Sequence, residues 1–317
     1  MSACLSLGER AAEFIKYKRG IGYVYSSQEK ILSRFIKYHD EQNGGAVLDK
    51  GTVLSYLENI EDSSGSLHNN ISVIREFGLY LYTIGDFNSY LIPEKIGSEY
   101  IPKPPYFFTE KEISTFFERI DSVLPDKGHR GRHLVIPAIF RLLYCCGLRC
   151  SEAIFLKVEN VHLSEKYIDI MQSKGPKDRR IFISEELSEY LASYDDQINL
   201  LFPNREYFFP NTSGHFKRSF LGNNFRRYWL EIYPDTSAEN MPTAYDFRHH
   251  FAYSNINQWV TDGVDVNAKL PYLMRYMGHK QIKETLYYFH FVPEFFSVYR
   301  EIAEKTAHII PEVYNEK

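Results

Sequence analysis

Three short stretches carry side chains that could act together on a phosphate ester. They are Gly-Leu-Arg-Cys-Ser-Glu (147–152), Tyr-Asp-Phe-Arg-His (245–249) and Gly-His followed nine residues later by Tyr (278–288). The planar forks of Arg149 and Arg248 could each bind two phosphate oxygens, and arginine stays charged at every working pH. The hydroxyl of Tyr288 could attack phosphorus and form a covalent intermediate, while His279 could donate a hydrogen bond. These residue types therefore suit phosphoryl transfer through a tyrosine.

Helix ends are expected to position these stretches. Gly278 is typical of the residue that follows the last turn of a helix, so the next residue would lie at a junction between two helices. The largely apolar segment 134–150 predicts a buried helix, with Arg149 and Glu152 at its end. Because an unpaired buried charge is costly, an ion pair between Arg149 and Glu152 is the plain structural alternative to a catalytic arginine.

A β-hairpin is expected between the first two stretches. Residues 167–171 and 180–183 alternate or run apolar, and the segment between them, Ser-Lys-Gly-Pro-Lys-Asp (173–178), is rich in turn formers. Lys174 lies in that turn. By itself, a lysine in a hairpin turn is more often a solvated side chain than a catalytic one.

The order of these motifs resembles that of the tyrosine recombinase (phage-integrase) family over about residues 107 to 295. The resemblance implies a mainly α fold with a small β-hairpin or sheet (α+β), in which a helical N-terminal domain and an integrase-type catalytic domain close around DNA as a clamp. It implies a catalytic set of Arg149, Lys174, Arg248, His279 and Tyr288, with Tyr245 in the one remaining catalytic position. It also implies that Glu152 and His249 orient or support the site.

Tyr245 departs from the family pattern, which usually has a histidine three residues before the second arginine. A tyrosine with a pKa near 10 donates hydrogen bonds but is a poor base at neutral pH. The sequence leaves open whether this change impairs activity. Tyr287 is an alternative nucleophile, and the family spacing of nine residues after His279 selects Tyr288 instead.

A proline-rich segment divides the chain into two expected domains. The prolines of Tyr-Ile-Pro-Lys-Pro-Pro favour an extended path, so residues 100–106 are predicted to be a linker. Residues 1–99 predict a helical, DNA-binding domain made of amphipathic helices separated by glycine- and serine-rich breaks. Residues 107–317 are assigned to the catalytic domain, which begins with the Thr-x-x-Glu capping box of Thr109.

Basic side chains on both domains are candidate DNA contacts. The candidates are Lys16, Lys18, Arg19, Lys177, Arg179, Arg180, Lys217, Arg218, Arg226 and Arg227. The formal net charge of −4 argues against DNA binding, because DNA-binding proteins usually carry a basic excess. A local basic stripe on an acidic protein would still bind phosphate. The alternative is that these cations complement helix dipoles or form solvated helix faces.

Composition narrows the class of protein. A chain of 317 residues with 44% hydrophobic and 25% charged residues is expected to fold into ordinary domains. No apolar run approaches the roughly 18 residues of a spanning helix, and Glu9, Arg10 and Glu13 interrupt any signal peptide. A cytoplasmic, nucleoid-associated protein is therefore expected. The cysteines lack the spacing of a zinc site and are predicted to be reduced core residues, and no metal or other cofactor is expected.

Three functions fit these observations. The first is a site-specific recombinase, integrase or transposase of a mobile element that cuts and rejoins double-stranded DNA through a 3′-phosphotyrosyl intermediate. It would act as a homotetramer on paired sites, with or without accessory proteins. The resemblance implies assembly through a C-terminal helix, expected here at 294–309, although this helix could equally close the core of its own domain. The second is a type IB-like DNA topoisomerase. The third is a catalytically impaired DNA-binding protein on the same scaffold.

Overall fold

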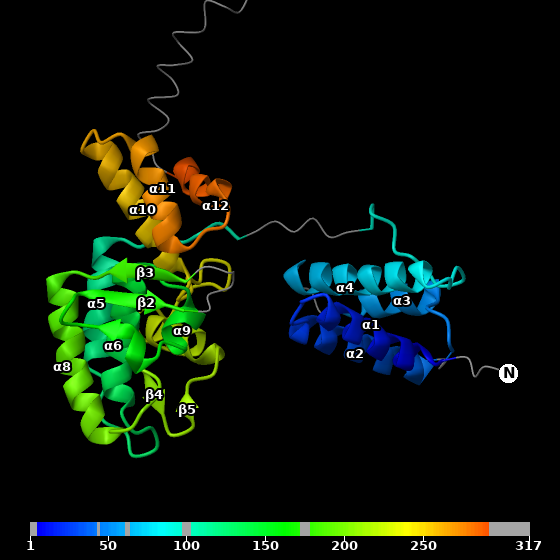
Figure 1. Cartoon of the computed structure of the whole chain (residues 1–317), viewed down its shortest axis with the longest axis horizontal. Coiled ribbons are helices and arrows are strands. Elements are labelled where there is room, and N and C mark those ends of the chain that lie inside the picture. Colours follow the sequence, from blue (N-terminus) through cyan, green and yellow to red (C-terminus); the bar gives the residue numbers. More distant parts are fainter. Residues whose placement is uncertain (1–4, 43–44, 61–63, 97–102, 172–177, 292–317) are drawn as a thin grey trace, which may run out of the picture. The chain divides into compact units, whose positions relative to one another are not determined.

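The protein folds into two compact units, Met1–Lys103 and Pro104–Lys317 (Figure 1). The computed structural model describes residues 5–42, 45–60, 64–96, 103–171 and 178–291. Each unit is built around its own hydrophobic core. Helices dominate, and short antiparallel strands occur in the second unit, which confirms the predicted mainly α fold with a small sheet. The C-terminal helix expected at 294–309 lies outside the described residues.

The first unit is a small bundle of helices. They are α1 (Leu7–Gly20), α2 (Ser26–Gln42), α3 (Lys50–Glu58) and α4 (Ser64–Thr83). A capping box starts α1, because the Ser6 hydroxyl accepts from the backbone of Glu9 and the Glu9 carboxylate accepts from the backbone of Ser6. The fully buried rings of Phe14, Phe35 and Phe77 occupy the core. The bundle is therefore held together by apolar stripes on each helix.

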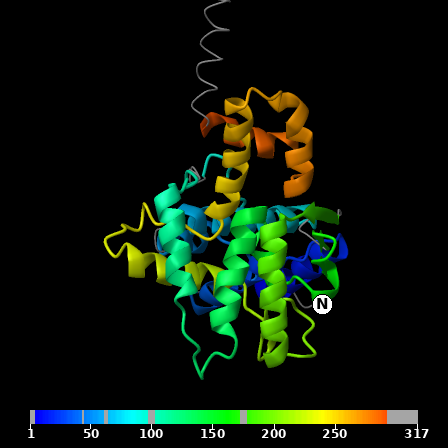
Figure 2. The same ribbon diagram turned by 90° about the vertical axis from the view of Figure 1, so that its left-hand side faces the viewer.

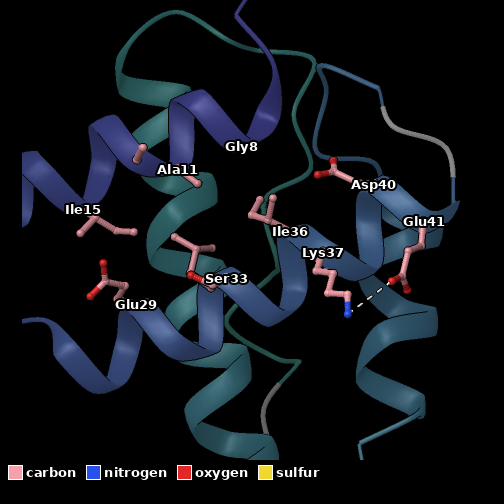
Figure 3. Close-up of a pocket in the computed structure, with 11 residues that line it drawn as sticks. Gly8, Ala11, Ile15, Glu29, Ser33, Ile36, Lys37, Asp40 and Glu41 are labelled. Carbon is pink, nitrogen blue, oxygen red and sulfur yellow. Dashed lines mark ion pairs between the residues drawn. The ribbon is translucent and has the colours of Figure 1, made fainter.

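A groove of about 610 Å³ runs between α1 and α2 (Figure 3). Gly8 and Ala11 of α1 and Ile36 of α2 are among the residues that line it. An ion pair between Lys37 and Glu41, 3.8 Å long, lies along its edge. None of the predicted catalytic residues lines this groove, so the chemistry must be sought in the second unit.

The second unit contains the remaining described helices. They are α5 (Glu110–Asp121), α6 (Arg132–Cys146), α7 (Cys150–Ile154), η1 (Val158–Asn160), α8 (Glu185–Leu201), α9 (Ser219–Ile232), α10 (Asp246–Thr261), α11 (Val266–Met277), α12 (Ile282–Leu286) and η2 (Tyr287–Phe291). The predicted capping box of Thr109 and Glu112 is present at the start of α5. Within the described part of both units, no helix is long and apolar enough to cross a membrane.

Helix α6 is the buried centre of the second unit. It packs against α8 and α10, and most of its side chains are inaccessible to solvent. It ends where Gly147 adopts a left-handed conformation, with φ of 57°. Cys146 is buried as predicted, but Cys145 is exposed, so the prediction that the cysteines are core residues is wrong at that position. Adjacent helical residues point about 100° apart, which explains the difference.

A three-stranded antiparallel sheet lies beside these helices. Its strands are β1 (Val161–His162), β2 (Tyr167–Ile170) and β3 (Arg179–Phe182), and a separate pair is formed by β4 (Pro210–Asn211) and β5 (Gly214–His215). The predicted hairpin arms are β2 and β3, with Ile168 opposite Ile181. Because side chains alternate along a strand, Arg179 and Ile181 face the interior while Arg180 faces solvent.

Helices α10, α11 and α12 group at one end of the second unit (Figures 1 and 2). Helix α10 contacts α6, α11 and η2, and α11 contacts β3. The hydroxyl of Tyr276 in α11 donates to the carbonyl of Phe182 in β3 at 3.2 Å. The end of α6, the start of α10, the end of α11 and strand β3 are thereby brought together.

Candidate active site

A single carboxylate joins two arginines where these elements meet. The fork of Arg179 donates to both carboxylate oxygens of Glu152, at 2.9 and 2.7 Å. Arg149 donates to Glu152 from Nη1 at 2.8 Å and from its backbone nitrogen at 2.9 Å. The ion pair between Arg149 and Glu152 is therefore present, as expected, and Arg179 completes it. The other arm of Arg149 donates to the carbonyl of Gly278 at 2.8 Å, which links α7 to the end of α11.

Glu152 remains ionised inside the protein. Burial by itself would raise the pKa of its carboxyl group, but the hydrogen bonds and charge of Arg179, together with the bonds from Arg149, lower that pKa to about 2. The carboxylate is therefore charged at any physiological pH. Its negative charge holds the guanidinium groups of Arg149 and Arg179 in defined positions. The pairing with Arg179 is bidentate, which also fixes its orientation.

Arg248 is buried more deeply than either of these arginines, with 1% of its surface exposed. Its two terminal nitrogens donate to the carbonyls of Gly147 and Met277, each at 2.6 Å. Burial and the nearby charge of Arg149 lower the pKa of Arg248. Its Nε is buried and has no hydrogen-bond partner among the described residues. An unsatisfied buried donor is costly, and the described part of the protein alone does not satisfy every donor of Arg248.

Two glycines permit these close approaches. Gly147 and Gly278 both adopt left-handed conformations, with φ of 57° and 67°. A Cβ atom on Gly147 would lie 2.6 Å from the ring of Phe251, and one on Gly278 would lie 3.1 Å from Nη1 of Arg179. Both glycine carbonyls accept from arginines of the site, and the expectation that Gly278 ends a helix is confirmed.

His279 follows directly after α11. Its Nδ1 lies 2.8 Å from the hydroxyl of Thr285, which is fully buried. Burial, followed by the charges of Arg248 and Arg149, lowers the pKa of His279 to about 3, so the ring is neutral at physiological pH. In the tautomer with its proton on Nε2, Nδ1 accepts from Thr285 and Nε2 remains a hydrogen-bond donor.

Tyr288 is enclosed, with 3% of its surface exposed. Its hydroxyl lies 2.9 Å from Nδ1 of His249, and its ring is nearly parallel to that of His279, with centroids 6.4 Å apart. Burial raises the pKa of Tyr288, and the charge of Arg248 opposes this rise. The adjacent Tyr287 is 37% exposed and contacts the ring of Tyr288 by its edge. The two tyrosines therefore have different environments, and Tyr288 is the one beside the histidines.

Tyr245 immediately precedes α10 and is 42% exposed. Its ring meets that of His249 at a steep angle, with centroids 4.9 Å apart. His249 in turn contacts Tyr288, with ring centroids 5.6 Å apart. Tyr245, His249 and Tyr288 thus form a row of rings that runs from the surface of the site to the enclosed hydroxyl.

Comparison with known proteins assigns this arrangement to a family. Residues 107–294 match the model of the phage integrase family. The chain belongs to that family. The matched segment contains every residue of the site described above, from Arg149 to Tyr288. The protein is accordingly a tyrosine recombinase, an enzyme that breaks and rejoins DNA.

Relatives of this integrase-family chain cover most of its length. The tyrosine recombinase XerC of Staphylococcus saprophyticus is 25% identical over 86% of the chain and 83% of the relative. The tyrosine recombinase XerD of Lacticaseibacillus casei is also 25% identical, over 88% of the chain and 92% of the relative. The similarity therefore extends into the N-terminal unit, beyond the segment that matches the family model.

Solved structures show that the recombinase fold is shared. The Tn1549 transposon integrase in complex with transposon right end DNA has a TM-score of 0.60 and 18% identity, covering 96% of this chain and all of the other. A lambda integrase dimer bound to a core site has a TM-score of 0.58 and 14% identity, covering 88% of this chain and 96% of the other. Both similarities concern the fold.

The cations expected to contact DNA differ in their surroundings. Arg179 does not fit that expectation, because the alternation of β3 turns it inward onto Glu152. Four candidates form ion pairs with carboxylates: Lys18 with Glu76, Arg19 with Glu29, Arg180 with Asp169, and Arg227 with Glu231. Four other candidates are exposed and form no ion pair within the described part of the chain: Lys16, Lys217, Arg218 and Arg226. Lys174 and Lys177 lie outside the described residues.

Some features of this recombinase site were not expected from the sequence. Arg179 shares its strand face with apolar Ile181, and that period of two could have indicated an inward arginine. The bond between Thr285 and His279 depends on the return of α12, which no local pattern indicates. His249 was expected to be a supporting residue, and its contact with the hydroxyl of Tyr288 joins parts of the chain that are far apart in sequence.

Proposed function

We propose that this tyrosine recombinase cuts and rejoins double-stranded DNA through Tyr288, which forms a 3′-phosphotyrosyl link. The main support for the proposal is that three functional side chains from separate parts of the sequence come together at the end of α11. Arg149, Arg248 and His279 come from three separate stretches, yet all are tied to the last residues of α11 or follow them directly. The charges of Arg248 and Arg149 both act on Tyr288. This arrangement supports attack by Tyr288 on a phosphate held by the two arginines.

The arginines would stabilise the charge that develops during attack. As the Tyr288 oxygen bonds to phosphorus and the bond to the deoxyribose 5′-oxygen breaks, negative charge spreads over the non-bridging oxygens. Arg149 and Arg248 keep N–H groups beyond those bound to backbone and Glu152, and Nε of Arg248 is a buried donor. Donors fixed in advance in a water-poor site are the strongest source of such stabilisation. The tyrosyl ester then conserves the energy needed for rejoining.

The remaining roles rest on the family resemblance together with the observed positions. Neutral His279 would donate a hydrogen bond from Nε2 to the phosphate, and Tyr245 would donate from the exposed edge of the site. Lys174 would protonate the departing 5′-oxygen as a general acid. Glu152 and Arg179 would not touch the substrate, because each is occupied with the other, and they would hold Arg149 in place.

The proposal extends to the DNA and the assembly. Two solved structures of similar fold are an integrase in complex with transposon right end DNA and an integrase dimer bound to a core site. We therefore propose that this chain acts on a mobile element and that a tetramer on paired sites carries out strand exchange, joined through the segment 294–309. Lys16, Lys217, Arg218 and Arg226, whose side chains are exposed, would contact the DNA backbone.

The first test is a trapping experiment. A labelled, nicked duplex built from the DNA that flanks the gene is mixed with wild type, Tyr288→Phe or Tyr287→Phe, and a denaturant-stable protein–DNA band is measured. Wild type and Tyr287→Phe are expected to trap the DNA, whereas Tyr288→Phe is expected to form no adduct. Loss of the band with Tyr287→Phe but not with Tyr288→Phe would show that Tyr287, and not Tyr288, is the nucleophile.

Two further results would point to other functions. Relaxation of supercoiled plasmid by single protomers, with no exchange between duplexes, would indicate a type IB-like topoisomerase. Binding of the duplex without any adduct would indicate a catalytically impaired DNA-binding protein. In that case, Tyr245→His tests whether the missing histidine is the cause, because restored trapping would show that the proton-transfer group had been lost.

A further inference from the structure

We infer that His249 accepts the proton of Tyr288 when the tyrosine attacks, and returns it when the DNA is rejoined. This inference deepens the proposed function and rests on it. The family pattern offers a histidine at the position of Tyr245, which is a phenol here. His249 is four residues further along, so it lies one helical turn away on the same side of α10. The imidazole that the reaction would need is therefore present at a neighbouring position.

Geometry singles out His249 among the nearby groups. Its Nδ1 lies 2.9 Å from the hydroxyl of Tyr288, within the reach that proton transfer requires. His279 cannot serve equally, because its Nδ1 is bonded to Thr285 and its ring stands parallel to that of Tyr288 at 6.4 Å. Within the described part of the chain, His249 is the hydrogen-bond partner of the enclosed Tyr288 hydroxyl.

The electrostatic surroundings keep His249 able to accept. Burial lowers the pKa of its imidazole, Arg248 adds to this effect, and Asp246 opposes it, so the ring is neutral at physiological pH. The groups that face His249 are Tyr245 and Asp246 at the start of α10, Arg248 beside it, Tyr288 from η2, and His279 after α11. A neutral imidazole with its proton on Nε2 presents the lone pair of Nδ1 to the tyrosine.

The proton balance of the step is simple. The O–H bond of Tyr288 breaks as its oxygen bonds to phosphorus, and the proton passes to Nδ1 of His249, which becomes an imidazolium. The bond from phosphorus to the 5′-oxygen breaks, and that oxygen takes a proton from the general acid of the proposed mechanism. Rejoining reverses both transfers: the 5′-hydroxyl attacks phosphorus, and Tyr288 departs with the proton from His249. One residue thus serves both half-reactions.

The test is single-turnover adduct formation on the same nicked duplex by the full-length protein. His249→Asn keeps a hydrogen-bond acceptor but cannot hold a proton at neutral pH, and it is expected to slow adduct formation by about 10²-fold. His249→Ala should be slower still, and added imidazole should restore part of its rate. Substituted imidazoles of higher basicity should restore more. A residue that merely shapes the site would give no such dependence on basicity.

His250→Asn is the matched control. This adjacent histidine contacts Tyr144 and Phe108 instead of the nucleophile, so its variant should form adduct within a few-fold of wild type. Equal rates for His249→Asn and wild type would overturn the inference. So would a slow His249→Ala enzyme that imidazoles fail to rescue while its melting temperature and DNA binding are intact. If wild type itself forms no adduct on any target, the proposed function is wrong, and the inference about His249 falls with it.

Discussion

The ion-paired cations of helix α1 in the N-terminal unit and the arginines of the active site are neutralised in different ways. In the first unit, Lys18 pairs with Glu76, Arg19 pairs with Glu29, and Arg10 pairs with Asp86. Each of these three positive charges has a carboxylate of its own. In the active site, by contrast, Arg149 and Arg179 share Glu152, and Arg248 donates to two backbone carbonyls.

The difference shows where phosphate would be attracted. Three guanidinium groups around one carboxylate leave an excess of positive charge in a buried place, where electrostatic interactions are strong. The formal net charge of −4 describes the whole chain and says little about this centre. Some of the acidic residues elsewhere, such as Glu29, Asp121 and Asp169, pair with surface cations and lie apart from this centre. Several active-site groups have a counterpart elsewhere in the chain whose charge or conformation is ordinary, and substitutions at both positions test the difference.

The largest effect is expected from Arg248→Lys. A lysine ammonium cannot donate to the carbonyls of Gly147 and Met277 and also present a planar fork to phosphate. Single-turnover cleavage should fall by roughly 10²- to 10³-fold, as when one preorganised donor is lost. Arg19→Lys, on a half-exposed ion pair, should cleave within about twofold of wild type. Comparable losses in both variants would remove the contrast between the two regions.

A large loss of stability is expected from Glu152→Gln. Removal of this carboxylate leaves Arg149 and Arg179 close together without their shared partner, which should destabilise the second unit by about 3–5 kcal/mol. Glu29→Gln, which breaks an exposed pair, should change stability by no more than about 0.5 kcal/mol. Thermal melting of both variants beside wild type measures the difference. A mild effect of Glu152→Gln would mean that water, not the carboxylate, compensates the arginines.

The same carboxylate predicts a dependence on pH. The pKa of Glu152 is lowered from 4.5 to about 2 in the folded protein. Its stabilising contribution is therefore complete above pH 4.5, the unfolded-state value, and is lost as the pH falls toward 2. The melting temperature of wild type should fall more steeply across this range than that of Glu152→Gln. Parallel curves for the two proteins would contradict the lowered pKa.

Local patterns in the sequence were sufficient for several parts of the structure. Thr109 with Glu112 predicted a capped helix start, and Gly278 predicted a helix end, because both depend on a few neighbouring residues. The pairing of Arg149 with Glu152 was also expected, since they are only three positions apart in the sequence. The two arms of the hairpin followed from their alternation and the turn between them.

Features that depend on packing between distant segments were not predicted. Arg179 was expected at the DNA, but the contact of β3 with α11 buries it against Glu152. Cys145 was expected in the core, but it lies on the exposed side of the end of α6. The contact between His249 and Tyr288 depends on where η2 returns beside α10. Sequence spacing indicates which residues take part, whereas their hydrogen-bond partners depend on the tertiary fold.

A smaller effect is expected from Gly278→Ala. The left-handed backbone conformation costs an alanine about 1 kcal/mol. The alanine Cβ would also lie only 3.1 to 3.3 Å from side-chain atoms of Arg179. Gly85 in the first unit has φ of 93° but nothing within 4 Å of the same position. Gly85→Ala should therefore lose only the conformational part. Gly278→Ala should melt at a lower temperature than Gly85→Ala and cleave more slowly, and equal melting would show that Arg179 adjusts freely.

The smallest effect is expected from surface cations of the second unit. Lys217 is exposed and has no ion pair within the described residues, whereas the guanidinium of Arg180 is paired with Asp169 at 2.9 Å. If Lys217 contacts a phosphate, Lys217→Ala should reduce the slope of log affinity against log salt by about 0.9. Arg180→Ala should reduce it less, because Asp169 already neutralises that charge. Filter binding across a salt series measures both slopes, and a larger change for Arg180→Ala would mean that DNA displaces Asp169 from its arginine.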